Sequence, residues 1–188
     1  MQEKILIIDF GGQYNQLIAR RVREQHVYCE LKPYSAGIEE IRAFDPAGII
    51  FTGGPNSVYD ESAPHIDPAI FALGVPILGI CYGCQLMAQQ LGGQVSPAQN
   101  DSAREYGKTS TRYDTACRMF AGLDVEGVSW MSHGDYISKL PEGFTACAHS
   151  AACPTAAICD ETRGFYGVQF HPEVAHTEHG AEMLRNFL

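Results

Sequence analysis

The sequence lacks any long hydrophobic run and any basic leader segment. No stretch reaches the roughly 18 unbroken apolar residues of a membrane-spanning helix. The chain opens with MQEKILIIDF, which is typical of a strand rather than of a charged segment followed by a cleavage site. We therefore expect a soluble, cytoplasmic protein that does not enter a membrane.

Positive charge is also scarce. Thirteen Lys and Arg residues stand against 22 Asp and Glu, which gives a formal net charge of −9. The basic side chains cluster only at Arg20, Arg21 and Arg23, inside a predicted helix, where a solvated face is the favoured interpretation and a contact with another subunit remains open. This balance argues against a nucleic-acid partner.

Paired cysteines are rare among the seven that the chain contains. With no secretory signal, an odd number of cysteines predicts reduced thiols rather than a disulfide framework. Five of the seven stand singly, at Cys29, Cys117, Cys147, Cys153 and Cys159. The other two, Cys81 and Cys84, lie three apart in GICYGCQLMAQQ, residues 79–90.

Internal repeats, low-complexity tracts and linkers are absent from the sequence. A length of 188 residues with 45% hydrophobic content suits one packed core, so we expect a single domain over 1–188. The last segment ends on an apolar pair, Phe187 and Leu188, which suggests a longer parent protein.

The first half of the chain alternates between strand and helix patterns. The predicted order is strand 4–9, helix 14–25, strand 27–32, helix 38–44, strand 47–52, helix 68–73, strand 76–80 and helix 83–91. In the second half we expect strands at 107–113, 128–131, 144–149, 155–159 and 165–170, some of them antiparallel, and a helix at 178–188. The alternation predicts an α/β fold with a doubly wound, mainly parallel sheet and helices on both faces.

Cys81 stands where a buried strand passes into a helix. Unpaired amides and the helix dipole at such a junction favour a thiolate. Gly79 and Gly83 flank it at minus two and plus two, the spacing of a nucleophile elbow, in which larger neighbours would collide across the strained turn. The sequence therefore predicts a nucleophilic Cys81.

Cys84 allows a different interpretation of the same motif. Cys-x-x-C at a helix start is also typical of thiol oxidoreductases and of zinc sites. Redox exchange does not need the flanking glycines, and the single cysteines offer no second metal-binding pair. We expect Cys84 to be a small buried apolar residue and expect no metal ligands.

A thiol nucleophile needs a base and a group that orients the base. His171 and Glu173 follow the strand predicted at 165–170, and two residues apart on an extended edge they can point the same way. The alternatives are a turn histidine or a metal cluster with His176 and His179, but metal ligation would leave Cys81 without a partner. We predict a Cys81, His171, Glu173 triad.

An attacked carbonyl also requires donors for its oxyanion. The strand predicted at 47–52 runs into Gly53, Gly54 and Pro55, which would lie beside Cys81 in a doubly wound sheet. The amides of Gly54 and Tyr82 are the candidate donors, although Gly-Gly-Pro alone is merely a turn.

Together, GICYG (79–83), TGGP (52–55) and QFHPE (169–173) resemble the class I glutamine amidotransferases. Finer stretches look like the glutaminase domains of GMP synthetases: DFGGQY (9–14), GPNSVY (54–59), REYG (104–107), WMSHGD (130–135) and YGVQFH (166–171). The likeness covers essentially the whole chain and implies a flavodoxin-like fold. Cys84 departs from it, standing where the family commonly carries methionine.

The resemblance implies that Cys81 attacks the side-chain amide of glutamine, with His171 moving the proton and Glu173 orienting His171. It implies substrate contacts from a further set, Gln85, Ser132, Gly134 and Asp135. This domain would need no cofactor. Ammonia would pass to an ATP-pyrophosphatase domain or subunit of GMP synthetase, which would hold ATP and Mg and aminate xanthosine monophosphate.

Two other functions remain open. The chain could be an amidotransferase of another pathway or a γ-glutamyl cysteine hydrolase of the same fold, against which the stretch at 130–135 argues by resemblance. It could instead be a regulator with a relic site, although a relic would be expected to lose a member of the triad.

Overall fold

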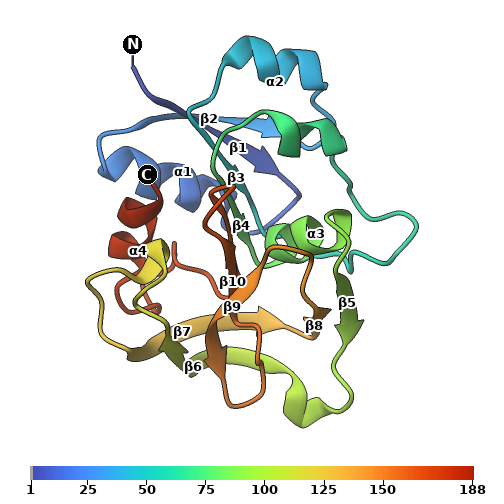
Figure 1. Cartoon of the computed structure of the whole chain (residues 1–188), viewed down its shortest axis with the longest axis vertical. Coiled ribbons are helices and arrows are strands. Elements are labelled where there is room, and N and C mark those ends of the chain that lie inside the picture. The colour runs from blue at the N-terminus through green and yellow to red at the C-terminus, as the bar shows by residue number, and fades with distance from the viewer. Residues whose placement is uncertain (1) are drawn as a thin grey trace.

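The computed structural model describes residues 2–188 and places nine strands in one sheet (Figure 1). The elements in chain order are β1 (Lys4–Asp9), α1 (Asn15–Glu24), β2 (Tyr28–Pro33), α2 (Ile38–Phe44), β3 (Gly48–Phe51), η1 (Pro68–Ala72), β4 (Ile77–Ile80), α3 (Tyr82–Gln90), β5 (Gln94–Pro97), η2 (Asp101–Ala103), β6 (Glu105–Tyr113), η3 (Arg118–Phe120), β7 (Glu126–His133), β8 (Asp135–Lys139), β9 (Thr145–Ser150), β10 (Ala157–Asp160), β11 (Phe165–Val168) and α4 (Gly180–Phe187). The sheet order is β2-β1-β3-β4-β11-β10-β9-β6-β7. The predicted α/β fold is confirmed.

The first five strands of this order, β2 to β11, run parallel to one another. The inner strands β3, β4 and β11 are buried along their whole length, which is why their sequences read as continuous apolar runs rather than as alternating ones. Because these strands are parallel, their carboxyl ends meet at one edge of the sheet, and the loops that leave that edge lie together.

Helices cover both faces of the sheet. The apolar sides of α1 and α4 pack on one face, and α2, η1 and α3 pack on the other. In Figure 1, α1 and α4 lie beside each other, away from α2 and α3. The helix predicted at 38–44 is confirmed to the residue; its buried Ile41 and the partly buried Ile38 and Phe44 pack against the core.

The remaining strands, β10, β9, β6 and β7, pair antiparallel and extend the sheet beyond β11. Along β6, exposed side chains alternate with more buried ones, as is usual for a strand with one face on the core and one face toward solvent. Strand β9 carries a register shift opposite Ala157 and Ile158, so that Cys147 is an extra residue between their partners.

Three features differ from the sequence prediction. The segment predicted as a helix at 68–73 is the five-residue 3-10 helix η1, which is capped by Asp67 and ends before Gly74, whose φ is +75°. The small antiparallel sheet of β5 and β8 was not predicted. The strand predicted at 128–131 is longer, since β7 spans Glu126–His133 and only Gly134 separates it from β8.

No helix within residues 2–188 combines the length and the apolar character that a membrane span requires.

Candidate active site

Cys81 occupies a strained position between β4 and α3. Its φ is +52°, a left-handed value that is rare for a residue with a side chain. A Cβ added to Gly79 would lie 2.6 Å from the Gly83 carbonyl oxygen, and one added to Gly83 would lie 2.5 Å from Phe51 Cβ. Both glycines are therefore required by close approach, as the spacing predicted, and the turn presents the Cys81 side chain above the sheet edge.

Strand pairing brings His171 to this cysteine. Strand β11 lies parallel to β4, with Val168 opposite Ile80, so the residues that follow the two strands emerge side by side. A Cβ added to Gly53 would lie 3.2 Å from His171 Cε1 and 3.6 Å from Cys81 Cβ. Both side chains therefore contact the same glycine, although ninety positions separate them in the chain.

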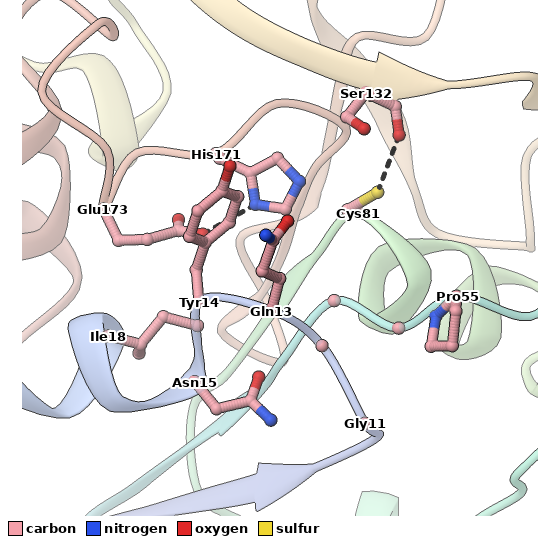
Figure 2. A pocket seen from close by; sticks show the side chains of 13 residues that line it. Gly11, Gln13, Tyr14, Asn15, Ile18, Pro55, Cys81, Ser132, His171 and Glu173 are labelled. Atoms are coloured by element: carbon pink, nitrogen blue, oxygen red, sulfur yellow. Dashed lines mark hydrogen bonds and ion pairs between the residues drawn. The ribbon is translucent and has the colours of Figure 1, made fainter.

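The imidazole of His171 lies between the Glu173 carboxylate and the Cys81 sulfur (Figure 2). Nδ1 of His171 is 2.6 Å from Oε1 of Glu173, and both side chains are buried. Burial alone would lower the pKa of His171, but the hydrogen bonds with Cys81 and Glu173 outweigh it and raise the pKa to about 10. The geometry joins all three residues of the predicted triad.

Neighbouring groups fix the orientation of this pair. Thr177 Oγ1 donates a hydrogen bond to the His171 carbonyl at 2.6 Å, and the ring of Tyr14 meets the imidazole edge-on, with centroids 5.4 Å apart. Arg21 Nε donates to the backbone carbonyl of Glu173 at 2.9 Å. The basic cluster of α1 is thus partly a support for the site as well as a solvated face.

The two predicted oxyanion donors flank Cys81. Tyr82 is the first residue of α3, where an amide has no intrahelical acceptor. Gly54 follows β3, and its amide donates to no backbone acceptor within the described part of the chain. A Cβ at Gly54 would lie 2.6 Å from the Phe10 carbonyl oxygen, so only glycine lets this segment approach β1 so closely.

Two cavities meet at Cys81. The first, of about 270 Å³, lies toward the loop after β1 and is lined by His171, Glu173 and Tyr14. The second, of about 450 Å³, lies on the other side. It is lined by every predicted oxyanion and substrate residue, namely Gly54, Tyr82, Gln85, Ser132, Gly134 and Asp135. The thiol is accessible from both.

Hydrogen bonds tie Gln85 to the elements that surround the thiol. Gln85 Nε2 donates to Gln169 Oε1 at 3.0 Å and to the Asp135 carbonyl at 3.3 Å. Gln169 Nε2 in turn donates to Cys81 Sγ at 3.7 Å, and that thiol faces the Ser132 carbonyl at 3.7 Å. Gln85 is 4% exposed, so its amide nitrogen serves this internal network.

The Asp135 carboxylate is held by two residues that the sequence did not single out. Ser57 Oγ donates to Oδ2 at 2.7 Å and Tyr59 OH donates to Oδ1 at 2.9 Å. Arg104 and Tyr106 were also missed, and both line the second cavity beside Gly134. The only available signal was that these polar residues fall within the stretches at 54–59 and 104–107 that carried the resemblance.

A second buried histidine pair supports the second cavity. His133 Nε2 is 3.1 Å from Oε2 of Glu105, and His133 Nδ1 is 2.8 Å from the Asp135 carbonyl oxygen. Burial would raise the pKa of Glu105, but hydrogen bonds from His133 and Ser150 prevail and lower it. This pair anchors the backbone of the junction between β7 and β8.

A family model described as glutamine amidotransferase class-I matches residues 6–188. The chain belongs to the class-I glutamine amidotransferase family. A solved structure of a GMP synthase component from Thermoplasma acidophilum matches 100% of this chain and 92% of its own length, with 33% identity and a TM-score of 0.87. An amidotransferase from Thermotoga maritima, 21% identical with a TM-score of 0.71, supports the fold.

Curated relatives of this amidotransferase are longer proteins. The GMP synthase [glutamine-hydrolyzing] of Clostridium perfringens is 58% identical over 188 residues, and that of Heliobacterium modesticaldum is 58% identical over 186 residues. The match covers 100% and 99% of this chain respectively, but 36% of each relative. The chain therefore spans about a third of the length of these relatives.

Proposed function

We propose that this amidotransferase hydrolyses glutamine to glutamate and ammonia through a thioester on Cys81. The observation that carries the proposal is the imidazole of His171, held by Glu173 and directed at a thiol on a strained turn. Attack of the sulfur on the carboxamide carbon forms the carbon–sulfur bond. The carbon–nitrogen bond then breaks, and His171 donates a proton to the leaving amine, which departs as ammonia.

Water completes the reaction. His171, now neutral, accepts a proton from a water that attacks the thioester, and the proton returns to the departing sulfur as glutamate is released. Glu173 accepts a hydrogen bond from Nδ1 and so leaves Nε2 to exchange protons. The first cavity borders His171 and offers space for this water.

The negative oxygen of each tetrahedral intermediate would be stabilised by backbone amides. Gly54 and Tyr82 flank Cys81, and the Tyr82 amide lies at the positive end of the α3 dipole. The side chain of Tyr82 takes no part, because it is buried and its hydroxyl donates to the Pro64 carbonyl.

The second cavity suits the amino-acid end of glutamine, which carries one positive and one negative charge. The Asp135 carboxylate is the candidate partner for the α-ammonium group. Arg104 supplies the only arginine or lysine side chain among the described residues that line this cavity, and it is the candidate partner for the α-carboxylate. Gln85, Ser132 and Gly134 shape the wall between these charges and the thiol.

The ammonia is proposed to serve GMP synthesis in the cytoplasm. The curated relatives carry the name GMP synthase, and this chain corresponds to about a third of their length. We infer that 1–188 is a single glutaminase domain and that an ATP-pyrophosphatase domain or subunit, with ATP and Mg, aminates xanthosine monophosphate. The competing proposal is that the domain delivers its ammonia to the enzyme of another pathway.

Substitution of the nucleophile tests the proposal. Cys81→Ala and Cys81→Ser should lower the rate of glutamate release by about 10⁴-fold or more, because no other group can form the thioester. Circular dichroism should be unchanged. The matched control is Cys84→Met, three residues away on α3, which should retain hydrolysis because it keeps an apolar side chain.

Full hydrolysis in either Cys81 variant would exclude the thioester mechanism, and a large loss in Cys84→Met would point back to a Cys-x-x-C function. The pathway is tested separately. The chain is mixed with an ATP-pyrophosphatase protein, ATP, Mg, xanthosine monophosphate and glutamine, and formation of GMP is expected. Hydrolysis without any GMP would favour another pathway.

A further inference from the structure

Three cysteines that stand singly in the sequence lie close together in the fold, and none of them is near Cys81 in the sequence. Cys117 caps the N-terminus of η3, Cys147 lies in β9 and Cys159 lies in β10. Their sulfur atoms all lie within 4.8 Å of one another. We call this group the three-cysteine cluster.

Strand pairing and one loop contact build the cluster. Cys159 is directly opposite Thr145, and Cys147 lies two residues further along β9 on the same face, at the register shift. The loop before η3 is tied to β9 because the Asp114 amide donates to the Cys147 carbonyl at 2.8 Å. The Cys117 amide donates to the Asp114 carbonyl at 3.1 Å, which directs Cys117 toward the two strands.

The cluster is enclosed but not sealed. Its residues Cys117, Cys147 and Cys159 are 4%, 3% and 5% exposed, so water is largely excluded while a narrow approach remains. One hydroxyl group faces the sulfurs, since Thr145 Oγ1 lies 3.7 Å from Cys159 Sγ. A hydroxyl in this position can donate to a thiolate ligand and fix its direction.

The three thiols lie close enough together to share one cation. A thiol must lose its proton to bind a metal ion, so binding of a cation at the cluster displaces the thiol protons.

We propose that Cys117, Cys147 and Cys159 form a binding site for a soft, thiophilic metal ion of the copper(I) class. Bonds of about 2.3 Å from one ion to three sulfurs place the sulfurs roughly 4 Å apart, within the spacing of the cluster. No histidine, carboxylate or fourth cysteine among residues 2–188 joins the group. Three thiolates without a fourth donor suit copper(I) better than zinc, which requires tetrahedral coordination.

The site is separate from glutamine hydrolysis. Cys81 faces Ser132, Gln169 and His171, and none of these contacts the cluster residues in the hydrogen-bond network. Occupancy of the cluster therefore does not require the proposed function to be correct, and either can fail alone.

The test titrates the full chain with copper(I) in the presence of a competing chelator, in a Cys81→Ser background that removes the reactive thiol. We expect one tightly held ion per chain, a sulfur-to-metal absorption band and three sulfur neighbours by X-ray absorption. Cys147→Ser and Cys159→Ser should each lose the ion. Cys29→Ser, another buried cysteine, is the matched control and should keep it.

In a parallel titration with zinc and a zinc chelator, the chain should hold zinc less tightly than it holds copper(I). The proposal is overturned if the chelator strips copper(I) from the chain, if zinc is held more tightly, or if the ion persists in both cluster variants. Loss of the ion in Cys153→Ser but not in the cluster variants would also overturn it. Circular dichroism and the hydrolysis rate of the variants with Cys81 restored distinguish loss of the site from loss of the fold.

Discussion

Two buried histidine–carboxylate pairs lie on either side of Cys81 and differ in what their rings face. In the pair after β11, one nitrogen of His171 contacts Glu173 at 2.6 Å and the other side of the ring is directed at the thiol. In the pair between β6 and β7, His133 uses Nε2 for Glu105 and Nδ1 for a backbone carbonyl. Burial and a carboxylate partner are common to both.

The difference shows what makes a buried histidine a candidate catalyst. His171 keeps a nitrogen available in the first cavity, beside Cys81, whereas both nitrogens of His133 are engaged by protein acceptors. A ring without a free nitrogen cannot exchange protons with a substrate. We therefore assign proton transfer to His171 and anchoring of the β7–β8 junction to His133.

Of the substitutions that compare the two pairs, Glu173→Gln is expected to have the largest effect, because it turns the acceptor of His171 into a donor. In Glu173→Gln the side-chain amide can donate to Nδ1 of His171, which leaves the proton on the nitrogen that faces Cys81. The ring then holds the wrong tautomer, and kcat for glutamine hydrolysis should fall by about 10³–10⁴-fold with little change in KM. Steady-state kinetics with glutamine measure kcat and KM separately.

Glu105→Gln is the matched substitution in the second pair. Its amide oxygen still accepts a hydrogen bond from His133, so kcat should change far less than in Glu173→Gln. Equal losses of kcat in the two variants would remove the distinction between a proton-transfer pair and an anchoring pair.

The next largest effect is a pH dependence of the free energy of unfolding, which arises from the His171–Glu173 pair. The pKa of His171 is raised from 6.5 to about 10, so its stabilising contribution is complete below pH 6.5 and is lost as the pH rises toward 10. Cys81 and Glu173 both raise this pKa. Cys81→Ala should therefore flatten the alkaline loss in the free energy of unfolding.

Urea unfolding across this pH range checks the loss, and NMR titration of the His171 ring checks its assignment. Cys84→Met is the control, since Cys84 does not contact the ring and should leave the titration unchanged. An unaltered alkaline limb in Cys81→Ala would show that another group is responsible.

The sequence predicted the first pair and not the second because of where each lies in the fold. His171 and Glu173 follow a buried parallel strand, and parallel neighbours bring their carboxyl ends together whatever the length of chain between them. The glycines around Cys81 also carried a local steric signal. These features follow from chain order and residue size, which a sequence displays.

The second pair depends on antiparallel register. His133 meets Glu105 because β7 pairs with β6 at that position, and nothing in the residues between them fixes this alignment. The three-cysteine cluster is similar, since Cys147 and Cys159 meet through a register shift and Cys117 joins from a loop. Cross-strand contacts of this kind depend on tertiary pairing that residue spacing alone does not determine.

The smallest expected effect tests whether the second pair anchors the cavity wall. Glu105→Ala removes the acceptor for His133 and for Ser150, whose hydroxyl donates to Oε1 at 2.5 Å. Buried donors left without an acceptor should lower the free energy of unfolding by about 1–3 kcal/mol, measured by urea denaturation. Since the His133 contact holds the Asp135 backbone, KM for glutamine should rise while kcat is largely kept. Recovery of stability and KM in Glu105→Gln would assign the role to hydrogen bonding. A fall in kcat with unchanged KM would instead place Glu105 in the proton-transfer chemistry and erase its contrast with Glu173.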